Sequence, residues 1–486
     1  MTPAATLQRF RKNEHGGVLL LWAVCVVMIL GFFGLIFDVG RLAATQSELQ
    51  SYADSVSLAA AAELDGKADS IARATSAASS LISDSQTFGD GARALDFAND
   101  VTLVFYKPGS DGKFQRSAAL ETTNSYAARF VEARIRDRDV RAAVTAAFSS
   151  LTGEETPDSS ASASGVAGFS LEACNVAPVA MCLPAVDFDA ASNIGKTLEV
   201  KLDVNVSRLI PGQLRAVHTL TDSLDGLQIC AGLLGKSLAA CLLAARQPET
   251  ACAGGGGLHI TADVSANDLA DAINTRFDKF SGIASGFQNN PNFSAAPNVL
   301  TGLLNAAGLC LPVGNLLGLG NDDIGLPTDD CLATGGCSVQ GNGVWDAGRT
   351  AYIEAHYGGE DPHPEAQTRF EFYQAEIEAA IEMEGTPLLG AVGGLLGGIA
   401  SEPRMCAPQA NKDIKRRLMV VAGIDCLSAE LDAAVTVPPV QQFFEVFTLG
   451  PAENGLLNVE ITACLGGNCG GGNLDTEVVD VVRLVE

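Results

Sequence analysis

The chain has 486 residues and a formal net charge of −26 at pH 7. This length is enough for two or three domains. A strongly acidic chain repels polyanions, so the charge argues against nucleic acid and anionic lipid surfaces as binding partners.

The first feature along the chain is an apolar segment that is long enough to cross a membrane. Residues 16–37 contain no charged side chain. A helix of that length spans about 33 Å, and the hydrocarbon core of a bilayer is about 30 Å thick. A secretory signal peptide has a shorter apolar core and a small-x-small cleavage site, which this segment lacks. We therefore expect a retained transmembrane helix.

The charges that flank this segment predict its orientation. The tail of residues 1–15 carries Arg9, Arg11 and Lys12 against one acidic residue, Glu14. Lysine and arginine are enriched in short cytoplasmic segments next to membrane helices. The sequence therefore predicts a cytoplasmic N-terminus, with the rest of the chain across the membrane.

Residues 38–65 are expected to continue the same helix as a juxtamembrane segment. Between residues 38 and 63 there is no proline, and the only glycine is Gly40. An apolar stripe recurs in steps of three and four residues, which is typical of a helix that packs along one side. The stripe consists of Leu42, Thr45, Leu49, Tyr52, Val56 and Ala59. Two interpretations stay open: the stripe packs on the chain's own domain, or it receives a partner's membrane helix. Gln46, Gln50 and Asp54 lie off the stripe and are expected to face water.

A series of short motifs follows the apolar span. An Asp-x-Gly-Arg exit at residues 38–41 is followed by Leu-Gln-x-x-Ala-Asp at residues 49–54 and an alanine run at residues 59–62. This series resembles the N-terminal segment of the Tad-like family, whose TadG members take part in assembly of Flp (tight adherence) pili. Later stretches extend the resemblance weakly, at Asn274–Asp278, Gly341–Asp346 and Lys415–Cys426.

The resemblance implies a single-pass protein of the bacterial inner membrane with a periplasmic domain. Its role would be structural, in scaffolding or anchoring the pilus machinery. The implied partners are other Tad/Flp pilus membrane components, including pseudopilin-like proteins. The residues that we expect at an interface with partner helices are Asp38, Gly40, Arg41, Leu49, Tyr52 and Val56.

Residues 66–170 are predicted to form a small α+β unit next to the membrane. Asp100–Tyr106 and Tyr126–Arg136 have the alternation and the flanking turn signals of strands. Ser159–Phe169 alternates small polar with small apolar residues. Its composition alone is that of a linker, but its period of two favours a strand.

Residues 171–486 are predicted to form a mixed α/β extracytoplasmic domain that contains the remaining cysteines. Strand patterns lie at Leu198–Val206, Lys415–Cys426 and Phe443–Leu449. Val264–Lys279 is a predicted helix, with Ser265 as its cap and Asp268 three residues later. Leu456–Val485 is expected to end the chain as two strands around a glycine-rich hairpin.

Twelve of the thirteen cysteines lie beyond the apolar span, and Cys25 lies within it. An even number suits disulfides in an oxidising compartment. Zinc sites use closely spaced cysteines together with histidine, and no Cys-x-x-Cys occurs. The expected short-loop bridges are Cys174/Cys182, Cys331/Cys337, Cys406/Cys426 and Cys464/Cys469. A second group, expected to pair within itself, is Cys230, Cys241, Cys252 and Cys310.

The chain offers little that indicates catalysis. It has neither a Gly-x-Ser-x-Gly nor a His-Glu-x-x-His motif, and we expect no enzyme activity, cofactor or metal. An alternative function is a cell-envelope adhesion or binding protein, with or without dependence on calcium. The acidic residues that could serve it are Asp322, Asp323, Asp329 and Asp330. A second cluster, which we expect to be irregular surface, contains Glu354, His356, Glu360, Asp361 and His363.

Overall fold

The structure is a computed structural model. The residues it describes are 17–81, 95–140, 144–146, 160–174, 176–202, 209–218, 228–230, 233, 235–246, 259–260, 264–288, 290–297, 300–301, 303–304, 310–311, 325–384, 405–406, 413–424, 426–427, 440–466, 469 and 471–485. The basic tail of residues 1–15, the acidic pair Asp322 and Asp323, and Cys252 lie outside them.

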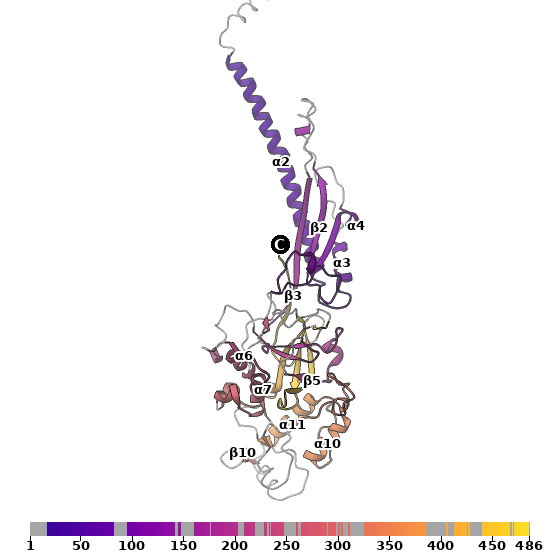
Figure 1. The fold of residues 1–486 in the computed structure, drawn as a ribbon, viewed down its shortest axis with the longest axis vertical. Coiled ribbons are helices and arrows are strands. Elements are labelled where there is room, and N and C mark those ends of the chain that lie inside the picture. The colour runs from indigo at the N-terminus through magenta and orange to yellow at the C-terminus, as the bar shows by residue number, and fades with distance from the viewer. Residues whose placement is uncertain are drawn as a thin grey trace, which may run out of the picture.

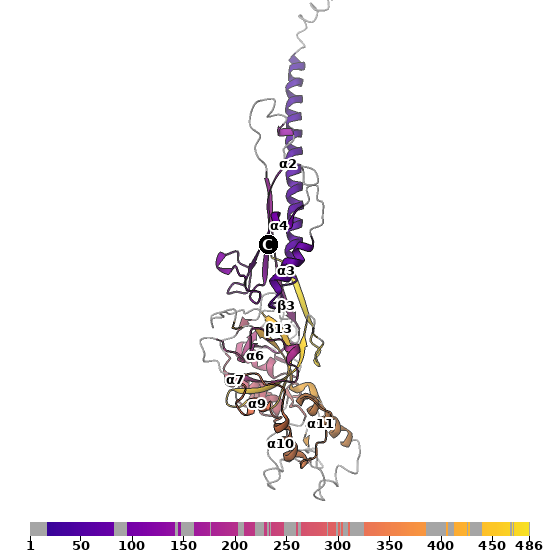
Figure 2. The ribbon, with the colours of Figure 1, turned by 90° about the vertical axis from the view of Figure 1, so that its right-hand side faces the viewer.

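One long helix projects from an elongated body (Figure 1). This helix, α2, runs without interruption from Gly17 to Ala61 over 45 residues. Its N-terminal half stands clear of the described chain, while its C-terminal half lies on a sheet (Figures 1 and 2). The predicted continuation of the apolar span into a juxtamembrane helix is confirmed.

The first sheet has four antiparallel strands in the order β1-β2-β3-β15. Their bounds are β1 (Val101–Tyr106), β2 (Phe130–Asp139), β3 (Ser160–Ala173) and β15 (Val478–Leu484). The strand predicted at Ser159–Phe169 is confirmed as β3, which continues past the domain boundary expected at residue 170. The last strand of the chain lies beside β3, with Val482 opposite Phe169. It does not form the expected hairpin with the strand before it, so the first sheet is built from both ends of the chain.

The second sheet has seven strands in the order β5-β14-β13-β12-β4-β6-β7. Its neighbours are antiparallel except for β12 and β4, which run parallel. The strands are β4 (Val179–Cys182), β5 (Thr197–Lys201), β6 (Leu214–His218), β7 (His259–Ile260), β12 (Leu418–Ile424), β13 (Val440–Thr448) and β14 (Leu456–Leu465). The other strands within the described ranges form two short pairs, β8 (Leu300–Thr301) with β11 (Met405–Cys406) and β9 (Leu303–Leu304) with β10 (Cys310–Leu311).

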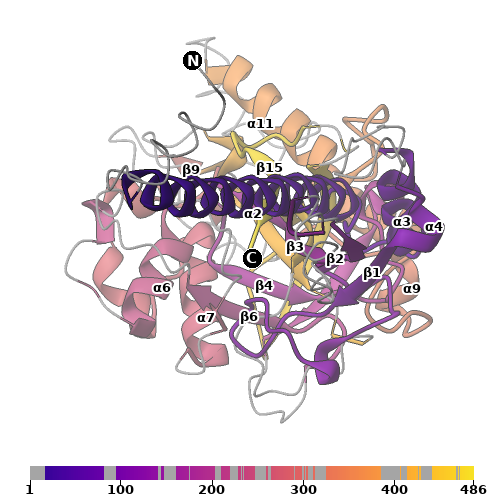
Figure 3. The same ribbon diagram turned by 90° about the horizontal axis from the view of Figure 1, so that it is seen from above.

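Helices cover both faces of the second sheet. Alternate residues of a strand point to opposite faces, so Met419 and Val421 of β12 pack with α6 and α7 on one face. Leu418 packs with the α10 and α11 region on the other face. Figure 3 shows α6 and α7 on one side of the body and α11 on the other. The α-helices besides α2 are α3 (Ser70–Ser80), α4 (Phe97–Asp100), α6 (Gly235–Ala244), α7 (Ala266–Asn274), α9 (Asp330–Ala333), α10 (Asp346–Tyr357) and α11 (Arg369–Glu384).

The cap predicted for α7 is confirmed. The Ser265 hydroxyl accepts a hydrogen bond from the Asp268 backbone N–H, and the Asp268 carboxylate accepts one from the Ser265 N–H. This reciprocal capping box satisfies two N–H groups that the start of a helix otherwise leaves without partners.

The disulfides agree with the expected pairing only in part. Bridges join Cys331 to Cys337, Cys464 to Cys469 and Cys230 to Cys241. The expected pairs Cys174/Cys182 and Cys406/Cys426 are wrong, because Cys182 is joined to Cys426. Cys182 ends β4, and its register partner on the neighbouring parallel strand is Ile424, two residues before Cys426. Sheet topology therefore brings these two cysteines together, although they are far apart in sequence.

Candidate functional site: the membrane helix and its junction with the first sheet

The N-terminal half of α2 is an apolar surface that the described chain leaves uncovered except at Gly34. Leu20 is 72% exposed and Phe37 is 56% exposed, and the large side chains between them are exposed as well. Among the described residues, α2 is the one helix that is long and apolar enough to cross a membrane. Such a surface is unfavourable in water but matches a lipid environment. Cys25 is a free thiol on this surface, within the apolar span, as the sequence indicates.

Asp38 ties the exit of the span to another part of the chain. Its carboxylate accepts hydrogen bonds from the backbone N–H of Val144 at 3.2 Å and from the N–H and hydroxyl of Thr145 at 2.7 Å. The side chain of Val144 lies so close to Gly34 that a Cβ there would come within 2.3 Å of it. Asp38 thus binds residues 144 and 145, from the β2–β3 connection, and the missing side chain of Gly34 leaves room for Val144 against the helix.

The next turns of α2 bond directly to the backbone of β3. β15 pairs with β3 only from Ala167 onward, so other groups must satisfy the carbonyls nearer the membrane. The Gln46 side-chain amide donates to the Ser162 carbonyl at 2.5 Å, and that of Gln50 donates to the Ser164 carbonyl at 2.9 Å. Gln46 is exposed, as expected, and Gln50 is half-buried. Both side chains also bond to β3, beyond the end of its pairing with β15.

Small residues in β3 let the helix come close to the sheet. A Cβ at Gly165 would lie 2.6 Å from a carboxylate oxygen of Asp54 and 2.8 Å from the backbone of Ala53. The neighbours on the same face, Ala161 and Ala163, are buried in the core beneath α2. The alternation of serine and alanine in this strand therefore makes a flat face on which a helix can lie.

The apolar stripe on α2 faces the chain's own sheet. Leu49 and Val56 are fully buried and Tyr52 is 7% exposed, all in the core formed with the first sheet. These three side chains are not available to a partner's helix, so their assignment to such an interface is corrected. Of the two open interpretations, packing on the chain's own domain is the one observed.

The exit motif has a mixed outcome. Asp38 is 8% exposed and engaged within the chain. Gly40 is open, since a Cβ there would meet no described atom within 4 Å. Arg41 is half-buried. The outer face of this part of α2 consists of Ala43, Ala44, Ser47, Glu48, Ser51 and Ser55. Apolar spacing does not reveal this face, because its side chains are polar or small.

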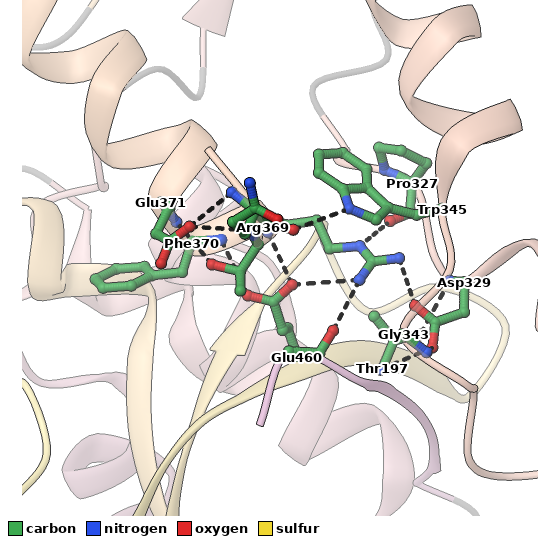
Figure 4. Close-up of polar contacts among 12 residues, drawn as sticks. Thr197, Pro327, Asp329, Gly343, Trp345, Arg369, Phe370, Glu371 and Glu460 are labelled. Carbon is green, nitrogen blue, oxygen red and sulfur yellow. Dashed lines mark hydrogen bonds and ion pairs between the residues drawn. The ribbon is translucent and has the colours of Figure 1, made fainter. Parts of the chain in front are cut away.

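A second polar centre lies deep in the body, where α11 begins (Figure 4). The side chain of Arg369 is fully buried and forms ion pairs with Asp329 and with Glu460, the latter at 3.4 Å. Glu460 also accepts the backbone N–H groups of Arg369 at 2.8 Å and of Phe370 at 3.0 Å. The guanidinium group lies 4.7 Å from the centre of the Trp345 ring. This cluster fastens the region of α9 to α11 to strand β14.

Burial raises the pKa of Glu460 to about 7, against the lowering effect of Arg369 and of the two backbone amides. Removing a carboxylate from water disfavours its charged form. Glu460 has a structural role, because it joins the start of α11 to strand β14, beside the packing of Phe370 and Tyr373 on Phe447. The ion pairs and backbone hydrogen bonds of this cluster join segments that are far apart in sequence, so we interpret it as a clamp.

The acidic residues considered for metal binding have other partners. Asp329 is engaged by Arg369 and by the Gly343 N–H at 2.7 Å. The Asp330 carboxylate accepts the N–H groups of Ala347 and Gly348 in the first turn of α10, both at 3.0 Å. Across the residues that the structure describes, no group of three or more His, Cys, Asp or Glu could hold a metal ion.

The second cluster considered for metal binding is also engaged in packing. Asp361 pairs with Arg349 at 2.9 Å. The rings of His356 and His363 lie against Tyr352 and Tyr357, with centroids 4.4 Å and 6.5 Å apart. These residues surround α10 as a layer of aromatic and charged side chains.

Comparison with known proteins agrees with this assignment of α2. Residues 16–63 match the model of a family described as putative Flp pilus-assembly TadE/G-like. No curated protein and no solved structure matches the chain. The matched residues contain all of α2, both its lipid-matching half and the half that lies on the first sheet. The chain therefore has a membrane anchor and juxtamembrane helix of the TadE/G-like type, which associates it with the Flp pilus-assembly machinery.

Proposed function

We propose that the chain is a structural component of Flp pilus assembly, without enzyme activity, that scaffolds or anchors the machinery from the bacterial inner membrane. Its N-terminus lies in the cytoplasm and its two sheets lie in the periplasm. The observation that carries this proposal is the continuity of α2: the TadE/G-like segment is one helix from the lipid-matching end to the end buried in the first core.

The way α2 is held supports a mechanical role. A helix of 45 residues is about 67 Å long. Asp38 fastens it near the membrane, the two glutamines fasten it to β3, and Leu49 and Val56 bury it in the core. A rotation or displacement of the helix in the membrane would therefore move the first sheet with it. This is what a scaffold that sets the position of a periplasmic domain needs.

The outer face of α2 is the surface that we propose for contact with other pilus membrane components. On this face, Gly40 has no described atom within 4 Å of a built Cβ, and small residues allow close approach of helices in membranes. Beyond the lipid the same helix presents Ser47, Glu48 and Ser51, all exposed. A partner that runs parallel to α2 would meet this face and not the buried stripe.

The experiment is site-specific photo-crosslinking in cells that assemble pili. A photoreactive residue is placed at Glu48 or Ser51, and at Glu354 on the exposed face of α10 as a matched control. We expect the α2 positions to capture identified pilus membrane proteins and the control position not to capture them. Capture of the same proteins from all three positions, or of no pilus component from α2, would contradict the proposed role.

A further inference from the structure

Three arginines converge where α6 ends and two short helical turns, η6 (Thr275–Phe277) and η9 (Ile414–Arg417), meet it. Arg416 donates to the Ala244 carbonyl at the end of α6 at 2.7 Å and to the Thr275 hydroxyl at 3.2 Å. Burial and the charges of Arg276 and Arg246 lower the pKa of Arg416 well below its usual value. Arg416 is thus close enough to Arg276 and to Arg246 for their positive charges to act on it.

These arginines differ in how completely their donors are satisfied. Arg416 donates to three carbonyls and one hydroxyl. Arg246 pairs with Asp413 at 3.3 Å, but its Nε has no hydrogen-bond partner in the part of the chain that the structure describes. Arg276 is 3% exposed, and neither its Nε nor its Nη1 has a partner among the described residues.

Arg276 stays positively charged near neutral pH. Burial lowers its pKa only to about 10. Asp413 is the acidic group that acts on this cluster, and it already pairs with Arg246. A buried charge without a counter-charge or hydrogen bonds is strongly unfavourable, and the donors of a guanidinium group match the oxygens of carboxylates and phosphates. The cluster therefore has both the donors and the charge to receive an anion.

We propose that Arg276, together with Arg246, binds a small oxyanion, a phosphate or carboxylate group. The oxygens of this group accept hydrogen bonds from the donors of Arg276 and Arg246 that have no partner among the described residues. Its negative charge offsets the positive charges that act on Arg416. Arg416, whose donors are used by carbonyls, holds the end of α6 in place beside the site. This site lies in the periplasmic body, apart from α2, and is independent of the pilus role proposed above.

The experiment measures binding of two probes, sodium phosphate and sodium acetate, to the purified full-length chain in a non-ionic detergent. Calorimetry is done at constant ionic strength adjusted with sodium chloride. We expect one or both probes to bind the unchanged protein, and Arg276→Met to weaken that binding about tenfold or more, as expected for loss of charge-assisted hydrogen bonds. Lys279→Met removes an exposed positive charge three residues away, paired only with Glu453, and should leave binding unchanged.

A thermal unfolding series supports the calorimetry. Phosphate stabilises folded proteins in general because it is excluded from their surface, so only the difference between variants is informative. The unchanged protein and Lys279→Met should gain more in Tm than Arg276→Met. If Arg276→Met does not fold, Arg246→Met takes its place, and it should also weaken binding. Absence of binding by the unchanged protein, or equal binding and equal gains in Tm for all variants, would overturn the proposal.

Discussion

The contact of α2 with β3 leads to a prediction for Gly165. A methyl group there would lie 2.6 Å from a carboxylate oxygen of Asp54 and 2.8 Å from backbone atoms of Ala53 and Asp54. The backbone of a helix cannot move aside as a side chain can, so Gly165→Ala must push α2 away from the sheet. Overpacking of this kind costs about 1–3 kcal/mol. Alanine lowers the entropy of the unfolded chain and offsets about 0.4–1 kcal/mol of that cost.

We therefore expect Gly165→Ala to destabilise the contact of α2 with the sheet by about 1–2 kcal/mol, the difference between those two effects. Hydrogen exchange of the full-length protein in detergent measures this locally. Amides of residues 45–61 should exchange about 5- to 30-fold faster in the variant, because 1.4 kcal/mol corresponds to a factor of ten. Strands β12 and β13 should keep their protection.

A matched control separates this effect from a general one. Gly286 has no atom within 4 Å of a built Cβ, so Gly286→Ala should leave exchange in α2 unchanged. Equal protection of α2 in Gly165→Ala and in the unchanged protein would refute the reasoning, because the close approach of helix and strand would then not limit the helix position.

Three further predictions concern the membrane helix, the buried carboxylate and the long-range disulfide. Gly40→Ala should leave the fold intact or stabilise α2 by up to about 1 kcal/mol, yet reduce the number of pili on cells, because a Cβ there obstructs only a partner; unchanged pilus counts would remove Gly40 from the interface. The free energy of unfolding should fall by about 3 kcal/mol as pH rises from 4.5 to 7. The reason is that folded Glu460, with its pKa raised to about 7, retains a proton that the unfolded chain releases. Denaturation series at several pH values measure this slope, and Glu460→Gln should lose it. Replacing both Cys182 and Cys426 by alanine should lower the free energy of unfolding by about 5 kcal/mol, since the bridge closes a loop with a sequence separation of 244. A change under about 1 kcal/mol would contradict this estimate.

Local sequence patterns predicted several elements, though not α10 or α11, and they did not predict all of the partners. The length of α2, the strand in the serine–alanine stretch and the α7 cap follow from spacing and residue type, which act within a few residues. The return of β15 to β3 and the bridge from Cys182 to Cys426 depend on which strands become neighbours in space. No pattern within either segment encodes that choice.

The same limit applies to the candidate site. The stripe of Leu49, Tyr52 and Val56 was visible as a packing surface, but its partner could be the chain's own sheet or another helix, and spacing does not distinguish the two. The hydrogen bonds of Gln46 and Gln50 to β3 were not predicted, because a polar side chain on a helix normally bonds to water. Their role becomes visible only once β15 is seen to leave part of β3 without a neighbouring strand.

The central claim is that α2 is a permanent membrane tether that holds a periplasmic body. Protease accessibility in spheroplasts tests it most directly, combined with fractionation of membranes at alkaline pH. We expect the full-length chain to remain with the membrane fraction, and protease added outside the inner membrane to digest the body while the N-terminal segment stays protected. Recovery of a soluble chain that begins after Arg41, or a body that is digested only after the inner membrane is opened, would contradict the account.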